Sequence, residues 1–123
     1  MVDDRVPVDA RSIRARFERA VTGLSLVAFI ASRNGDSDIW IEVDTGSETA
    51  VIVNQPLAAR VGLSTPVAGS GAQIDLRLDG GAPVRTPVET SAMIFDGNLG
   101  LGTMRSWVLT FDLEKERVWI RTP

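Results

Sequence analysis

The chain has 123 residues, with 13 Lys and Arg, 16 Asp and Glu, and no His, Cys or Tyr. Without His or Cys there is no imidazole or thiolate to serve as a nucleophile pair or a zinc ligand, and no disulfide can form. We therefore expect no metal and no cofactor, and any chemistry must rest on carboxylates and hydroxyls. The net charge of −3 argues against a nucleic-acid partner, because phosphate binding favours a basic surface.

The apolar fraction of 44% and the charged fraction of 24% are typical of a globular protein. A chain of this length suits one domain, and it buries roughly two thirds of its unfolded surface. No run approaches the roughly 20 apolar residues of a membrane helix, and the acidic start Met1-Val2-Asp3-Asp4 is unlike a signal peptide. These features predict a soluble chain with no membrane partner, either cytoplasmic or a trimmed periplasmic domain.

Residues 1–20 carry the weakest pattern. Four arginines surround Ile13 and Phe17, which are four residues apart. That spacing favours one or two helical turns, and an arm or linker is equally compatible with it. We therefore expect an N-terminal arm over 1–20 and one domain over 21–123.

From residue 21 the pattern changes to strands and turns. Residues 24–31 are apolar on both faces, which is typical of a buried strand. The turn residues Asn34-Gly35-Asp36 separate it from a return strand over 39–43. Residues 49–53 predict another strand. A short helix is expected over 55–61, with Pro56 in its first turn and Gly62 just beyond its end.

The second half continues in the same way after a loop over 65–72. Residues 73–78 alternate in polarity, Asp79-Gly80-Gly81 is a hairpin signal, and the prolines within 83–88 favour an edge strand. A glycine-rich turn over 96–102 and a short helix around 103–105 follow. Further strands are expected over 107–111 and 117–120. The whole reads as an all-β chain, a small barrel or a folded sheet.

The clearest chemical signal is a carboxylate at the end of an apolar strand. Asp44 follows the strand over 39–43 and opens a tight turn of small residues, Thr45-Gly46-Ser47. Two carboxylates held about 3 Å apart cannot both ionise, so one acts as base while the other keeps a proton. Small neighbours let two such turns approach each other. The pattern suits peptide hydrolysis by a pair of Asp residues, and a plain Asx turn is the alternative.

The run Asp44-Thr45-Gly46-Ser47 resembles the active-site loop of retropepsin-like aspartic proteases, the single-lobe type of bacteria and retroelements. The strand 51–53 with the helix after it resembles the segment that follows this loop. Residues 96–104 resemble the second signature of the family, and residues 107–120 its last strand pair. The resemblance covers residues 21–121.

This resemblance implies a closed β-barrel with one or two short helices and a homodimeric aspartic endopeptidase that binds its peptide or protein substrate as an extended strand. Asp44 would act as base and acid in turn, while Thr45 and Ser47 hold the pair together. The tip Asp79-Gly80-Gly81 would be the flap over the substrate, and Leu99 and Gly100 would support the catalytic loop. The segments 117–121 and 1–8 would pair across the dimer interface.

Three residues near these motifs leave alternatives open. Asn98 stands where the family usually has an apolar residue, which weakens the expected support beneath the loop. Asp96 could be a second catalytic Asp, although a turn fits Asp-Gly better. Glu42 could tune Asp44 or be a solvated or salt-bridged strand residue. A non-catalytic domain of the same fold that binds a peptide or partner protein, or one lobe of a larger two-lobed protease, therefore stays open as an alternative.

Overall fold

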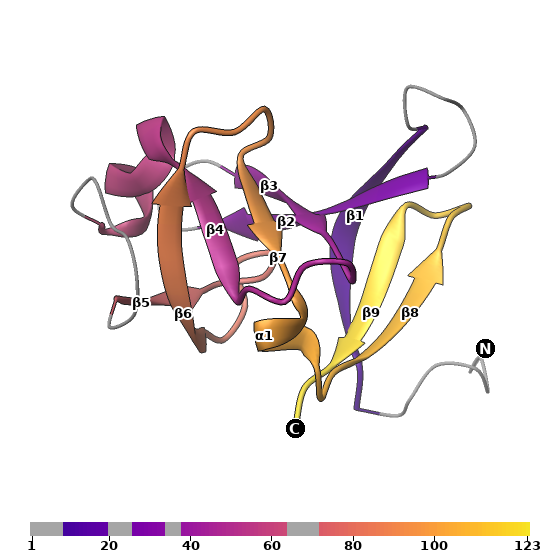
Figure 1. Cartoon of the computed structure of the whole chain (residues 1–123). Coiled ribbons are helices and arrows are strands. Elements are labelled where there is room, and N and C mark those ends of the chain that lie inside the picture. The colour runs from indigo at the N-terminus through magenta and orange to yellow at the C-terminus, as the bar shows by residue number, and fades with distance from the viewer. Residues whose placement is uncertain (1–8, 20–25, 34–37, 64–71) are drawn as a thin grey trace.

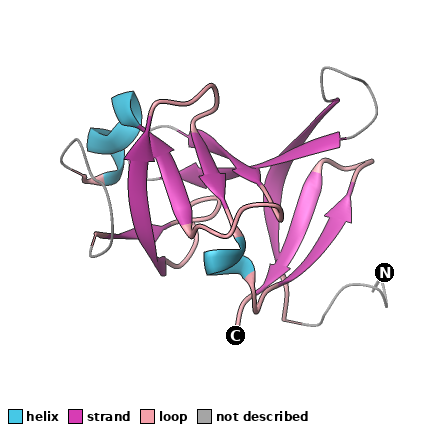
Figure 2. Cartoon of the chain, in the orientation of Figure 1, coloured by secondary structure: helices cyan, strands magenta, loops and turns pink. Residues whose placement is uncertain are grey.

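The computed structural model describes residues 9–19, 26–33, 38–63 and 72–123, and within them it has nine strands and two short helices (Figure 2). The strands are β1 (Arg11–Arg19), β2 (Leu26–Arg33), β3 (Asp38–Val43), β4 (Val51–Asn54), β5 (Gln73–Leu76), β6 (Val84–Ser91), β7 (Gly97–Leu99), β8 (Val108–Asp112) and β9 (Arg117–Arg121). The helices are the 3-10 helix η1 (Gln55–Val61) and the single-turn helix α1 (Leu101–Met104). The all-β prediction is confirmed, and none of the described helices has the length and apolarity to cross a membrane.

The strands form one sheet in the order β5-β6-β4-β7-β3-β2-β1-β9-β8 (Figure 1). The short strand β7 lies between β3 and β4, parallel to the first and antiparallel to the second. The chain that leaves β3 must therefore pass the end of β7 before it enters β4. An isolated bridge between Ser32 and Leu78 also brings the segment after β5 against β2.

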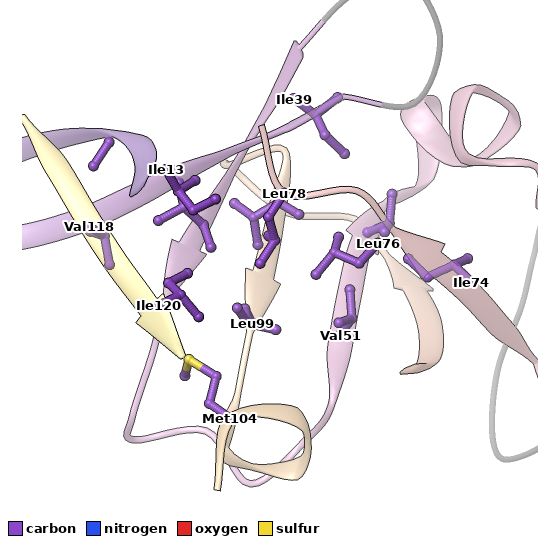
Figure 3. Packing of buried hydrophobic residues seen from close by; sticks show 14 of the residues in the cluster. Ile13, Ile39, Val51, Ile74, Leu76, Leu78, Leu99, Met104, Val118 and Ile120 are labelled. Carbon is purple, nitrogen blue, oxygen red and sulfur yellow. The ribbon is translucent and has the colours of Figure 1, made fainter. Parts of the chain in front are cut away.

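Among the described residues, the core is a cluster of buried apolar side chains from strands across the sheet, joined by Leu78 after β5 and by Met104 of α1 (Figure 3). Alternation along β3 is typical of how the strands contribute. Ile39 and Ile41 enter the core, while Trp40 and Glu42 lie on the opposite face. Because successive side chains alternate, β3 can hold the core with one set of residues and carry polar groups with the other.

Residues 11–19 form β1, where the sequence predicts a helical turn or an arm. The strand pairs with β2 on one side and with β9 on the other, so it belongs to the same sheet as the rest of the described chain. Ile13 and Ala15 are buried in it. A spacing of four residues places Ile13 and Phe17 on one face of a strand as well as of a helix, so the pattern alone did not separate the two structures.

β7 is the second strand that the sequence does not predict, because it lies within the expected glycine-rich turn. A Cβ at Gly97 would lie 2.9 Å from the carbonyl oxygen of Ile52 on β4. The glycine thus allows β7 to fit closely between its two neighbours.

Two edge assignments also differ from expectation. β6 lies between β5 and β4, so the prolines at 83 and 87 do not mark an edge strand. β9 pairs with β1 and β8 within the chain, so its backbone cannot pair across an interface as the sequence predicts. The expected turn at 34–36 and the segment 1–8 lie outside the described residues.

Candidate active site

The loop that carries Asp44 begins where β3 ends and is fixed by backbone hydrogen bonds. The Asp44 N–H donates to the Leu99 carbonyl at 3.0 Å, and the Ser47 N–H donates to the Asp44 carbonyl at 3.2 Å. Asp44 is half-buried, whereas Thr45 and Gly46 are exposed. The carboxylate therefore lies in a fixed turn at the surface of the chain.

Both oxygens of the Asp44 carboxylate accept a hydrogen bond from a neutral donor. Oδ1 accepts the Gly46 N–H at 2.9 Å, and Oδ2 accepts an Asn98 Nδ2–H, also at 2.9 Å. Within the described part of the chain, no ion pair joins Asp44 to Arg or Lys. Asp44 is thus oriented without being neutralised by a fixed cation.

The segment that follows β7 closes the loop from the other side. Three N–H groups in succession donate into it: Gly100 to Ala50 at 2.8 Å, Leu101 to Ser47 at 2.8 Å, and Gly102 to Thr49 at 3.0 Å. A Cβ at Gly100 would lie 2.8 Å from the Ser47 carbonyl oxygen. The structure therefore brings Leu99 and Gly100 against the Asp44 loop, and the close approach requires glycine at 100.

The two hydroxyl residues of the motif lie differently from each other. Ser47 Oγ shares a 2.6 Å hydrogen bond with Thr49 Oγ1, so its hydroxyl contacts the loop and not the Asp44 carboxylate. Thr45 is exposed beside Asp44, and among the described residues its hydroxyl makes no hydrogen bond. Ser47 thus stabilises the turn, while Thr45 faces outward where another chain could reach it.

Asn98 was expected to weaken the support beneath the loop, and the sequence did not predict its contact with Asp44. It is only 8% exposed, and it lies in register with Glu42 of β3 and Ile52 of β4. The neighbouring Leu99 is fully buried in the core. Alternation along β7 therefore turns Asn98 toward Asp44, and the same period of two in the sequence could have placed it there.

Glu42 precedes Asp44 by two residues on the same face of β3, which makes it a second carboxylate close to the site. Burial raises the pKa of Glu42, and the negative charge of Asp44 raises it further, while the Asn98 amide lowers it in part. Glu42 therefore takes up a proton more readily than an ordinary Glu. It is not a freely solvated strand residue.

The Asp79-Gly80-Gly81 segment is a tight turn that is fixed to β1. Asp79 and Gly80 have φ values of 52° and 74°, and the Gly81 N–H donates to the Leu78 carbonyl at 3.0 Å, as in a type I′ turn. Asp79 Oδ1 lies 2.6 Å from Arg14 Nε, and Oδ2 accepts the Arg14 N–H at 3.1 Å. No contact in the described residues joins this turn to Asp44. These bonds do not support its expected role as a mobile flap tip.

Asp96 has a structural contact that accounts for its carboxylate. Its Oδ2 accepts the Trp40 N–H at 2.9 Å, and its carbonyl accepts the Asn54 N–H at 2.8 Å. Asp96 therefore ties the start of β7 to β3 and β4. These contacts fit the expectation that Asp96 forms a turn better than the alternative that it is a second catalytic Asp.

No protein-family model matches the sequence, and no curated protein matches it. Solved structures of similar fold include two whose proteins are named for a retropepsin or a retroviral protease. A retropepsin-like aspartic protease from Rickettsia conorii has a TM-score of 0.58 at 15% identity, covering 98% of this chain and 96% of that chain. The retroviral protease-like domain of Ddi1 from Leishmania major has a TM-score of 0.53 at 19% identity, covering 76% and 95%. The chain therefore has the retropepsin-like fold, with Asp44 at the loop between β3 and β4.

Proposed function

We propose that the chain is an aspartic endopeptidase whose active site forms when two copies bring their Asp44 side chains together. The observation that carries this proposal is the state of Asp44: it is half-buried at an exposed turn, with each oxygen oriented by a neutral donor. One such carboxylate is half of the machinery, because the reaction needs a base and an acid at once. A two-fold axis beside Thr45 and Gly46 would supply the second from an identical chain.

The chemistry follows from the sharing of one proton by two carboxylates. The ionised Asp44 takes a proton from a water molecule as the water oxygen attacks the peptide carbonyl carbon. The Asp44 of the other copy gives its proton to the carbonyl oxygen. When the tetrahedral species breaks its C–N bond, the first Asp44 gives its proton to the leaving nitrogen. The second Asp44 takes a proton back from one hydroxyl of the tetrahedral carbon, so that a carboxylic acid forms and the pair again holds one proton.

The substrate class is a peptide or protein chain bound in extended form, so that its backbone can lie against the strands that flank the site. In the proposed dimer the Thr45 hydroxyls, which are exposed in the single chain, meet near the axis and fix the two turns relative to each other. Because the pair needs one proton, activity should be highest at acid to mildly acid pH. As an aspartic endopeptidase, the chain should also be inhibited by pepstatin.

Mixing wild-type chains with Asp44→Asn chains tests whether the site is shared. At a fixed amount of wild-type chain, an equal amount of Asp44→Asn chain that exchanges freely should reduce peptidase activity to about half, because mixed dimers hold one carboxylate. Asp75→Asn, which removes an exposed carboxylate paired with Arg85, is the matched control and should leave activity unchanged.

Light scattering on the same samples establishes the size of the species. Undiminished activity in the mixture would mean that each chain holds a complete site, which contradicts the proposal. A monomer without activity would favour a binding domain or one lobe of a larger protease.

A further inference from the structure

We propose that Asn98 is a positioning residue for Asp44, and that its amide, placed between Glu42 and Asp44, sets the pH range over which the Asp44 pair works. This inference rests on the proposed peptidase function. It concerns a side chain that neither touches the substrate's reacting atoms nor belongs to the Asp-Thr-Gly turn.

The geometry comes from the pairing of β3 with β7. Glu42 is in register with Asn98, and Val43 is in register with Leu99. Paired residues lie on the same face of a sheet, as do residues two apart on one strand. Glu42, Asn98 and Asp44 therefore share one face, and the 2.9 Å bond from Asn98 Nδ2 to Asp44 Oδ2 joins two of them.

The orientation of the amide is fixed by what its partners can do. A carboxylate only accepts hydrogen bonds, so the nitrogen of Asn98 must face Asp44. This leaves Asn98 Oδ1 buried, without a hydrogen-bond partner among the described residues. A buried acceptor without a donor is costly. Asn98 Nδ2 carries a second N–H, and hydrogen bonding from the Asn98 amide lowers the pKa of Glu42 in part, so the amide acts on both carboxylates.

The same arrangement makes the two carboxylates of one chain depend on each other. A donor to a carboxylate favours the ionised form, whereas a second negative charge nearby favours the protonated form. Asn98 and Asp44 therefore act on the pKa of Glu42 in opposite directions. The raised pKa of Glu42 fits this coupling, since the charge of Asp44 is one of its causes.

The other charged groups near this face are shielded from Asn98. Arg16 on β1 is in register with Phe29, which lies between it and Glu42, and Arg16 stacks on Trp40. On the other side, β4 contributes Ile52, and only beyond it does β6 carry a charge, at Glu89. In the loop, Glu48 is exposed and faces Arg105 at 3.9 Å. Among the described residues, Glu42 and Asn98 are thus the side chains that act on Asp44, beside the backbone N–H of Gly46.

The experiment compares pH–activity profiles of three variants. Asn98→Leu keeps the size of the side chain and removes the donor, so both limbs of the profile should move up by about one pH unit. The value of kcat/KM at the wild-type optimum should fall about tenfold as Asp44 loses its orientation. Glu42→Gln removes the like charge and should move both limbs down. Ile52→Leu, beside Asn98 on β4, is the control and should move neither limb.

A titration that does not need activity separates this inference from the proposed function. The carboxyl carbon resonance of Glu42, followed by NMR against pH, should have its midpoint at higher pH in Asn98→Leu and at lower pH in Asp44→Asn. Unchanged midpoints in both variants would overturn the role of Asn98, even in an active protease. If the midpoints shift in opposite directions but the wild-type chain cleaves no peptide, the role of Asn98 is supported and the peptidase proposal fails.

Discussion

Two groups of carboxylates in this chain are held in opposite ways. Asp44 accepts hydrogen bonds from the Gly46 backbone and the Asn98 amide, both neutral. In contrast, Asp38 and Asp79 both lie against the guanidinium of Arg14, at 3.0 Å and 2.6 Å. Arg33 and Arg117 add longer contacts to the same cluster. Within the described residues, the first carboxylate has no cation against it, whereas the carboxylates of the second group are held in ion pairs with arginines.

The two groups lie in different parts of one sheet. The Arg14 cluster joins β1, the start of β3 and the turn after β5, which are distant in sequence. The Asp44 site uses the other end of β3 and the end of β7. Substitutions in the two groups should therefore change different measurements.

The largest expected effect is on activity at Asp44. We expect Asp44→Asn to lower kcat/KM by at least about 10³-fold, because an amide can neither take the proton from water nor return it. The thermal unfolding temperature should stay close to that of the wild type, since Asn can still accept the Gly46 N–H. Peptide cleavage and thermal unfolding measured on the same preparation check both statements. Wild-type activity in Asp44→Asn would contradict the catalytic role proposed for Asp44.

The next effect is on stability at Asp79. We expect Asp79→Ala to lower the free energy of unfolding by about 1–3 kcal/mol, because it leaves Arg14 without one partner and places Ala at a positive φ. Asp79→Asn should cost less, because Asn tolerates this backbone conformation and can still accept the Arg14 N–H. Urea unfolding measures both variants, and both should retain peptidase activity. Loss of activity in the folded Asn variant would show that the turn takes part in the site.

The smallest effects are those of pH on stability, and they have opposite signs in the two groups. The hydrogen bond from Arg14 lowers the pKa of Asp38 below its ordinary value of 3.8. The stability that Asp38 contributes is therefore present above pH 3.8 and is lost as pH falls through the folded value. Asp38→Asn should destabilise the chain at neutral pH, and its difference from the wild type should shrink in acid.

For Glu42 the sign reverses, because burial raises its pKa above the ordinary value of 4.5. Its favourable contribution is complete below pH 4.5 and is lost as pH rises through the folded value. Glu42→Gln should therefore be more stable than the wild type at neutral pH and equal to it in strong acid. Unfolding temperatures of both variants across pH check the signs, and parallel curves would show that the two carboxylates are in similar surroundings.

The sequence predicted those parts of the fold whose local pattern was unambiguous. The helix over 55–61 has the predicted bounds, with Gly62 at a φ of 80° just beyond it. Strands with clear alternation, such as β3 and β5, were also found close to their expected places. In these segments the local preference and the tertiary structure agree.

The remaining features depend on contacts between distant segments. β1 was missed because the Ile13–Phe17 spacing fits two structures, and β7 because a strand of three residues in a glycine-rich run has no pattern of its own. Asp79 has the turn chemistry that was expected, but its partner Arg14 is 65 positions away, so its fixed role was not visible. Asn98 contacts Asp44 across 54 positions. The sequence indicated that Asn98 weakens the support beneath the catalytic loop, whereas in the structure its amide donates to Asp44.

The stoichiometry of pepstatin binding tests the central claim most directly. Isothermal titration calorimetry at mildly acid pH should give one inhibitor for every two chains, because two Asp44 side chains form one site. Asp44→Asn should abolish this binding. One inhibitor per chain, or no binding to a folded wild-type dimer, would contradict the assignment of Asp44 to a shared catalytic pair.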